Sequence, residues 1–197
     1  GLMSDFLNVG EIFDEKYKNL ILNIISQSRE ITIKAELVFT NPTATKIVQV
    51  SAIFCEKRQF NLHLVRGTKK FPFIGFARGI GLKRFTRHFL PANILEFHSN
   101  FTNVDTVLAF ENAVLNKCFY AETNNLEAAK SFTSDLLFQK SLEQLSSLNV
   151  LSIRNSKSMH TNERQLFLVL HLERDSLREL DHAVEFVQQC LNDLDKF

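Results

Sequence analysis

Residues 30–40, EITIKAELVFT, contain the pattern that decides the fold class. Every second side chain from Ile31 to Leu37 is apolar, which is typical of a β-strand with one buried face. Two further runs follow within 30 residues, KIVQVSAIF (46–54) and RQFNLHLVR (58–66). We therefore expect three neighbouring strands that form an antiparallel meander with one solvent-exposed face.

The third of these runs gives the first histidine to consider, His63. Its alternation places Phe60, Leu62 and Leu64 on one side of the strand and Asn61, His63 and Val65 on the other. Histidine is usually found at or near the protein surface. We therefore expect His63 to be solvated on the exposed face of the meander.

Helical periodicity dominates the sequence near both termini. In residues 11–28, EIFDEKYKNLILNIISQS, apolar side chains from Ile12 to Ile25 recur at helical spacing and predict an amphipathic helix. A second helix is predicted to begin at Asp175 or Ser176 and to run towards residue 194. Its apolar stripe consists of Leu177, Leu180, Val184, Val187 and Leu191.

The middle of the chain mixes extended and helical patterns. Residues 94–110 look extended, two helices follow with Asn124 or Asn125 and Thr133 or Ser134 as N-caps, and strands are expected at 149–153 and 165–172. Strands and helices do not alternate regularly as they do in a doubly wound sheet. We therefore predict one α+β domain over residues 1–197, with an antiparallel sheet, amphipathic helices near both termini and a subdivision near 92–104.

Composition excludes several classes of protein. With 45% hydrophobic and 23% charged residues, the chain is globular rather than disordered. The three cysteines show no metal-ligand spacing, and no HExxH, GxSxG or phosphate-loop motif occurs, so we expect neither metal nor cofactor. The unpaired cysteines favour a reducing compartment, which predicts an intracellular, cytoplasmic protein with membrane association left open.

Charge is distributed very unevenly. Residues 57–95 contain nine Lys or Arg and no Asp or Glu, although the whole chain has a net charge of only +1. We call residues 66–89 the basic segment, since most of these bases lie there among phenylalanines and glycines. The bases expected to attract an anionic partner are Arg66, Lys69, Lys70, Arg78, Lys83, Arg84 and Arg87, and the apolar docking residues are Phe71, Phe73 and Phe76.

The basic segment predicts a non-enzymatic binding module for an anionic membrane surface or a protein partner. Nucleic acid is less favoured, because the rest of the chain is acidic. Three alternatives remain open at this point. The bases could pair with the protein's own acidic surface; an enzyme site could gather His63, His88 and His98 with nearby carboxylates; or the terminal helices could form an oligomer, with the basic segment incidental.

One stretch also resembles a known family. Residues 115–136 are similar to a motif of packing and capping residues, F-N-x-x-F-x-V-x-S-x-D-x-x-x-A followed by L-T-x-x-L, of a bacterial, often membrane-anchored family of unknown function. Leu115 replaces the first Phe of that motif and Asn125 replaces its Asp, and the resemblance extends over about residues 105–195. It implies a globular module presented beside a membrane and carries over no catalytic residue. The other corresponding positions are Asn116, Phe119, Ala121, Thr123, Ala129, Phe132, Thr133 and Leu136.

Overall fold

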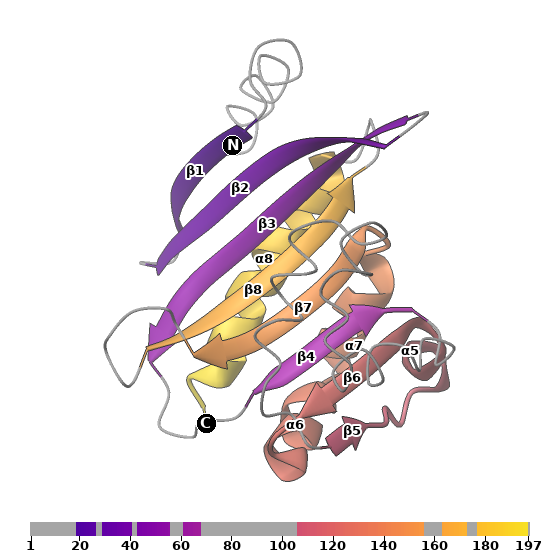
Figure 1. The fold of residues 1–197 in the computed structure, drawn as a ribbon. Helices are drawn as coiled ribbons and strands as arrows, with labels where there is room; N and C mark the ends of the chain where they lie inside the picture. Colours follow the sequence, from indigo (N-terminus) through magenta and orange to yellow (C-terminus); the bar gives the residue numbers. More distant parts are fainter. Residues whose placement is uncertain are drawn as a thin grey trace, which may run out of the picture.

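The computed structural model describes residues 19–26, 29–40, 43–55, 61–67, 106–155, 163–172 and 177–196. Within these ranges the chain forms one eight-stranded antiparallel sheet and four helices, which establishes a mixed α+β fold (Figure 1). The strands are β1 (Asn19–Ser26), β2 (Arg29–Thr40), β3 (Thr43–Cys55), β4 (Leu62–Arg66), β5 (Thr106–Leu108), β6 (Phe119–Thr123), β7 (Leu148–Asn155) and β8 (Glu163–Leu172). The helices are α5 (Ala113–Cys118), α6 (Leu126–Thr133), α7 (Leu136–Gln144) and α8 (Leu177–Leu194).

The strand order across the sheet is β1-β2-β3-β8-β7-β4-β6-β5. The antiparallel pairing of β2 with β3 agrees with the predicted meander, but β4 does not pair with β3. The β7–β8 hairpin lies between them instead. β8 is apolar on both faces, and residues 166–170 are all buried, so it suits the middle of the sheet better than β4 does. The predicted three-stranded meander is therefore wrong beyond its first two strands.

The helix predicted over residues 11–28 is also wrong where the structure describes it. Residues 19–26 form β1, which pairs with β2 at all eight positions. Ile24 is buried whereas Ile25 is 75% exposed, as expected for neighbours on opposite faces of a strand. The sequence NLILNIIS satisfies helical spacing and alternation at once, and its three isoleucines favour a strand. Residues 11–18 lie outside the described residues.

The helical pair in the middle of the chain begins close to the predicted positions. Asn125 caps α6, and its side-chain oxygen accepts a hydrogen bond from Ala128 N at 3.1 Å. The cap of α7 is Asp135 rather than Thr133 or Ser134. Thr133 is still part of α6, where its hydroxyl donates to the carbonyl of Ala129 at 2.8 Å. It is therefore not available to begin the next helix.

The core lies between the sheet and α8, which packs behind β3 and β8 in Figure 1. Ile33, Val50 and Leu168 are opposite one another across three strands on this face and are fully buried. The predicted stripe of α8 also faces the core, with Leu180, Val184, Val187 and Leu191 buried. Its predicted N-caps lie outside the described residues.

A chain of phenylalanine rings joins the helices to one another. Phe138 of α7 lies between Phe132 of α6 and Phe186 of α8, with ring centroids 4.9 and 5.5 Å away. All three side chains are buried. These contacts place α6, α7 and α8 in one continuous layer on the same core. Strands from before and after residues 92–104 are likewise hydrogen-bonded in one sheet.

Candidate functional site

Of the ten residues predicted to form a binding site in the basic segment, Arg66 is the one that the structure describes. It is the last residue of β4, and the following Gly67 N donates to Cys118 O at 2.9 Å, beside the start of β6. The next described residue, Thr106 of β5, pairs with Thr123 at the other end of β6. The remaining predicted residues, Lys69, Lys70, Phe71, Phe73, Phe76, Arg78, Lys83, Arg84 and Arg87, lie outside the described residues.

Arg66 makes several contacts within the fold. Its Nε donates to Leu148 O at 2.7 Å and one terminal nitrogen donates to Leu145 O at 2.9 Å. The guanidinium also lies over the ring of Phe119, 4.5 Å from the centroid. Burial lowers the pKa of Arg66, although a guanidinium remains charged at neutral pH. Arg66 thus connects β4 to the turn between α7 and β7.

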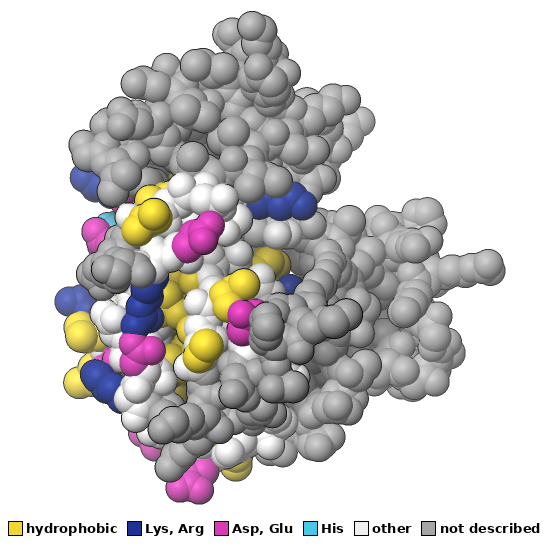
Figure 2. Space-filling view, turned by 90° about the vertical axis from the view of Figure 1, so that its left-hand side faces the viewer, with side chains coloured by type: hydrophobic (Ala, Val, Ile, Leu, Met, Phe, Trp, Pro, Cys, Tyr) yellow, Lys and Arg dark blue, Asp and Glu magenta, His cyan; other side chains and the backbone are white. Residues whose placement is uncertain are grey.

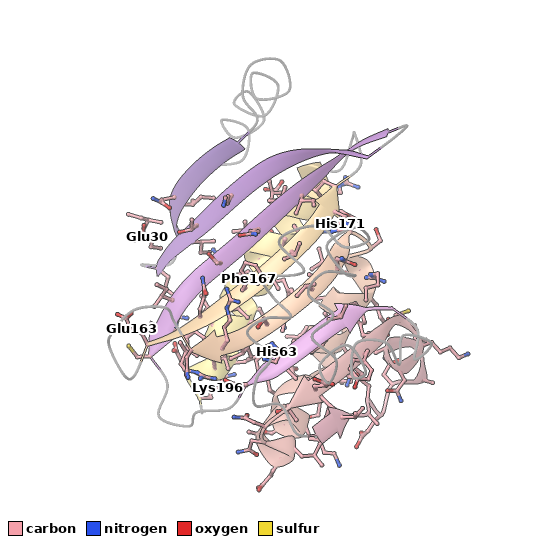
Figure 3. The ribbon with its side chains drawn as sticks, in the orientation of Figure 1. Glu30, His63, Glu163, Phe167, His171 and Lys196 are labelled. Atoms are coloured by element: carbon pink, nitrogen blue, oxygen red, sulfur yellow. The ribbon has the colours of Figure 1, made fainter. Side chains whose placement is uncertain are left out.

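His63 is buried, which overturns the prediction that it is solvated. Only 3% of its surface is exposed, and its Nδ1 lies 2.8 Å from the hydroxyl oxygen of Ser152. The prediction assumed that this face of the strand is exposed, whereas Ser152 and Glu122, the cross-strand neighbours of His63, are buried as well. Ser152 of β7 and Glu122 of β6 flank His63 on the same face of the sheet. His63, labelled in Figure 3, lies on the face opposite the core that α8 covers.

We call Ser152, His63, Glu122 and Tyr120 the polar row. Glu122 is the cross-strand partner of His63, and side chains so placed have Cβ atoms about 5 Å apart. The hydroxyl of Tyr120 donates to Glu122 Oε1 at 2.7 Å. The row thus brings a hydroxyl, an imidazole and a carboxylate together from three strands. These are the residue types of nucleophilic catalysis, although Ser152 is fully buried.

Two further side chains line the same face beside the polar row. The guanidinium of Arg154 lies 4.8 Å from the ring centroid of Phe167, and its Nε donates to Gln165 Oε1 at 3.3 Å. Further along β8, His171 Nε2 lies 3.3 Å from Asn149 Nδ2, and burial lowers the pKa of His171. Polar side chains thus lie on this face at both sides of the buried apolar residues Val150 and Val169.

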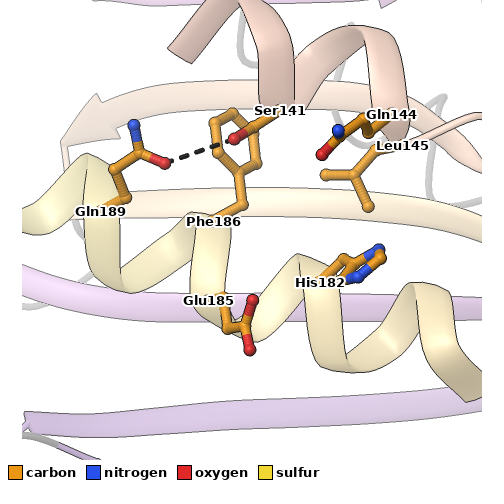
Figure 4. Close-up of a pocket in the computed structure, with 7 residues that line it drawn as sticks. All are labelled: Ser141, Gln144, Leu145, His182, Glu185, Phe186 and Gln189. Carbon is orange, nitrogen blue, oxygen red and sulfur yellow. Dashed lines mark hydrogen bonds between the residues drawn. The ribbon is translucent and has the colours of Figure 1, made fainter. Parts of the chain in front are cut away.

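A cavity lies between α7 and α8 in the helix layer (Figure 4). The hydroxyl of Ser141 donates across it to Gln189 Oε1 at 3.3 Å. His182 lines the cavity and is exposed. The cavity is lined by Ser141, Gln144, Leu145, His182, Glu185, Phe186 and Gln189.

Figure 2 shows the edge of the sheet near β1, where exposed hydrophobic, basic and acidic side chains of the described residues are intermingled.

Two carboxyl groups meet near the end of α8, and their contact predicts a pH effect. Burial and a hydrogen bond with Asp135 raise the pKa of Asp193, while Lys196 acts in the opposite direction. A raised pKa in the folded state means that the stabilising contribution is present at acidic pH and is lost as pH rises through that pKa. We therefore expect Asp193→Asn, which keeps a neutral side chain at every pH, to stabilise the protein at pH 7 by about 0.5 kcal/mol.

Urea unfolding of both proteins at acidic and neutral pH measures this difference. The stabilisation should shrink as the pH falls and Asp193 of the wild type becomes protonated. Asp181→Asn, on the same helix and away from this pair, is the control and should show no such pH dependence. An Asp193→Asn variant that is less stable than the wild type at pH 7 would show that the ion pair with Lys196, whose Nζ lies 3.4 Å from Asp193, outweighs the carboxyl contact.

Comparison with known proteins does not assign this arrangement to a family: no family model, curated protein or solved structure matches the chain. Among the described residues, no three His, Cys, Asp or Glu side chains are placed to hold a metal ion. In the same part of the chain, no helix combines the length and apolar character needed to cross a membrane. The cysteines there are unpaired, and burial raises the pKa of Cys190.

Most of the polar row was not predicted. His63 alone was named, as a candidate of the enzyme alternative, whereas Ser152, Glu122 and Tyr120 were not. A signal was present, because Ser152 and Glu122 interrupt otherwise apolar strands, VLSI and FYAET. Polar residues in such strands need a partner when they are buried. The sequence alone did not reveal that β6 and β7 lie on either side of β4.

Proposed function

We propose that this chain is a non-enzymatic binding module that attaches to an anionic membrane surface through the basic segment. One observation carries the proposal: residues 57–95 contain nine bases and no acid within a chain of nearly neutral net charge. Basic side chains near an anionic lipid surface contribute about 1 kcal/mol each. The resemblance of residues 105–195 to an often membrane-anchored family supports the same location beside a membrane.

The two residue types in the segment would act in different ways. Lys69, Lys70, Arg78, Lys83, Arg84 and Arg87 would supply long-range attraction, which salt weakens. Phe71, Phe73 and Phe76 would supply apolar area that enters the interface after contact. Arg66 would anchor the beginning of the segment, since its guanidinium is hydrogen-bonded to two backbone carbonyls of the folded body.

Co-sedimentation with anionic and neutral vesicles at low and raised salt tests the proposal. We expect the wild type to bind anionic vesicles at low salt, to bind them less at raised salt, and not to bind neutral ones. The variant Lys83→Glu/Arg84→Glu/Arg87→Glu should lose most of this binding. Three charge reversals among bases that contribute about 1 kcal/mol each are expected to reduce affinity at least a hundredfold.

A matched control separates the basic segment from overall charge. Lys117→Glu/Lys130→Glu/Lys140→Glu produces the same change in net charge on exposed side chains of α5, α6 and α7. Its binding should fall much less than that of the variant in the segment. Equal losses would indicate nonspecific attraction, and no binding by the wild type at either salt would overturn the lipid proposal in favour of a protein partner.

The alternative function is an enzyme with a site assembled from distant residues, and one observation favours it. The sheet places Ser152 and His63, 89 positions apart in sequence, within 2.8 Å of each other and beside Glu122. A fluorophosphonate probe that reacts with activated serines tests this alternative. Labelling of the wild type that is lost in Ser152→Ala would identify Ser152 as a nucleophile, whereas an unlabelled wild type would leave the polar row as part of the fold.

A further inference from the structure

β1 forms one edge of the sheet. All eight of its residues pair with β2, and no described strand lies on its other side (Figure 1). A strand in this position presents a row of backbone N–H and C=O groups to its surroundings. The opposite edge, β5, is only three residues long and offers a much shorter row.

The sequence of β1 itself lacks the charges and prolines that usually prevent edge strands from pairing. Its sequence, NLILNIIS, contains no charged residue and no proline, and five of its eight residues are leucine or isoleucine. Ile25 is 75% exposed, although isoleucine is usually buried. A long, uncharged and apolar edge of this kind is expected to accept another strand.

We propose that a second copy of this chain pairs with β1 through its own β1, in antiparallel orientation, and continues the sheet from one protomer to the other. A two-fold axis perpendicular to the sheet keeps corresponding faces on the same side, so paired residues must share a face. The register with Asn23 opposite Asn23 of the second copy meets this condition. It places Ile21 opposite Ile25, and Leu22 opposite Ile24, of the other protomer.

The chemistry of β1 favours a second copy over a charged partner. The strand carries no charge, so two copies do not repel each other, and a charged peptide would gain no opposite charge there. The register pairs aliphatic side chains on both faces of the sheet. At the axis, the side-chain oxygen of Asn23 accepts from the hydroxyl of Thr32 at 3.0 Å, and its NH2 group can donate to Asn23 of the other copy.

This interface uses no residue of the basic segment and differs from oligomerisation through the terminal helices. The apolar stripe of α8, at Leu180, Val184, Val187 and Leu191, is buried against the protein's own sheet. An exposed apolar face on α8 is therefore absent along these described positions. The edge at β1 offers unpaired backbone groups beside an exposed apolar side chain, Ile25, for symmetric pairing.

Light scattering coupled to size-exclusion chromatography tests the proposal on the full chain. The wild type should have twice the 22.7 kDa mass of one chain at micromolar concentration, and Ile25→Lys should shift it to the mass of a single chain. The introduced lysine would face Ile21 of the other copy across the axis, so that two charges enter an apolar contact. Because Ile25 is exposed in the single chain, the variant should still fold, which circular dichroism verifies.

Ile53→Lys is the matched control. Ile53 is 57% exposed on the same face of the sheet, but it belongs to β3, an interior strand. This variant should keep the mass of a dimer. A wild type with the mass of one chain, or an Ile25→Lys variant with an unchanged dimer mass, would overturn the proposed interface.

Crosslinking tests the register. In a Cys55→Ser background, which removes the exposed cysteine, Asn23→Cys should form a disulfide-linked dimer under mild oxidation. Directly opposite residues of antiparallel strands have Cα atoms about 4.5–5.5 Å apart, which is within the range that a disulfide requires. Ile53→Cys in the same background should remain uncrosslinked. A dimer in which both variants crosslink equally, or neither does, would contradict the register centred on Asn23.

Discussion

Replacing Phe138 with alanine is expected to lower the free energy of unfolding by about 3–5 kcal/mol. The side chain is completely buried, and its ring lies between those of Phe132 and Phe186. Alanine would leave a cavity at the point where α6, α7 and α8 meet, and each neighbouring ring would lose its aromatic contact. The decrease in the free energy of unfolding should therefore exceed the free energy of transferring the ring to water alone.

Urea denaturation followed by circular dichroism measures this effect. Leu137→Ala is a matched control, because Leu137 is the preceding residue of α7 and is 63% exposed. It should change stability by about 0.5 kcal/mol or less. If Phe138→Ala cost no more than the control, the helices would not form one layer through this ring, and the described core would need revision.

The elements were easier to predict from the sequence than their arrangement. The alternation in β2 and β3 is local, and the cap at Asn125 depends only on the residues that follow it. The position of β4 depends instead on the β7–β8 hairpin, which lies more than 80 residues later in the chain. No periodicity within residues 58–66 contains that information, so both the meander and the solvated His63 were predicted incorrectly.

β1 shows a different limit of sequence analysis. Its isoleucines and leucines fit helical spacing and strand alternation equally well, and Asn23 breaks neither pattern. The outcome depends on whether β2 offers an edge with which to pair. The structure shows that β2 does so at every position from Arg29 to Glu36. Whether a short apolar run of this kind forms a helix or a strand is therefore decided by the neighbouring strand with which it can pair, rather than by its own sequence.

The charge of the basic segment was visible in the sequence because composition does not depend on the fold. The polar row was not visible, because its members come from β4, β6 and β7 and only the sheet register brings them together. Arg66 belongs to the basic segment and not to the polar row, and the structure adds its contacts to what charge predicted. It was predicted from charge, and the structure shows that its guanidinium is hydrogen-bonded to backbone carbonyls and lies over Phe119.

Ser152→Ala is expected to lower the free energy of unfolding by about 1–3 kcal/mol, since it removes a hydrogen-bond partner of the buried His63. His63→Leu should cost a similar amount, because it leaves the hydroxyl of Ser152 without the imidazole. The double variant should cost less than the sum of the two single ones, by about 1 kcal/mol, as expected for residues in direct contact. Urea denaturation of the four proteins measures this coupling.

Whether these substitutions lower or raise the free energy of unfolding distinguishes a structural polar row from a catalytic one. A row that stabilises the fold loses stability when either partner is removed, because a buried polar group then loses a hydrogen bond. Active-site groups are often held at a cost to stability, so that their replacement by apolar residues stabilises the protein. Destabilisation by both single variants, with favourable coupling, would support a binding module that keeps this row for its fold. Stabilisation by Ser152→Ala would contradict that role and favour the enzyme alternative, in which Ser152, His63 and Glu122 act together.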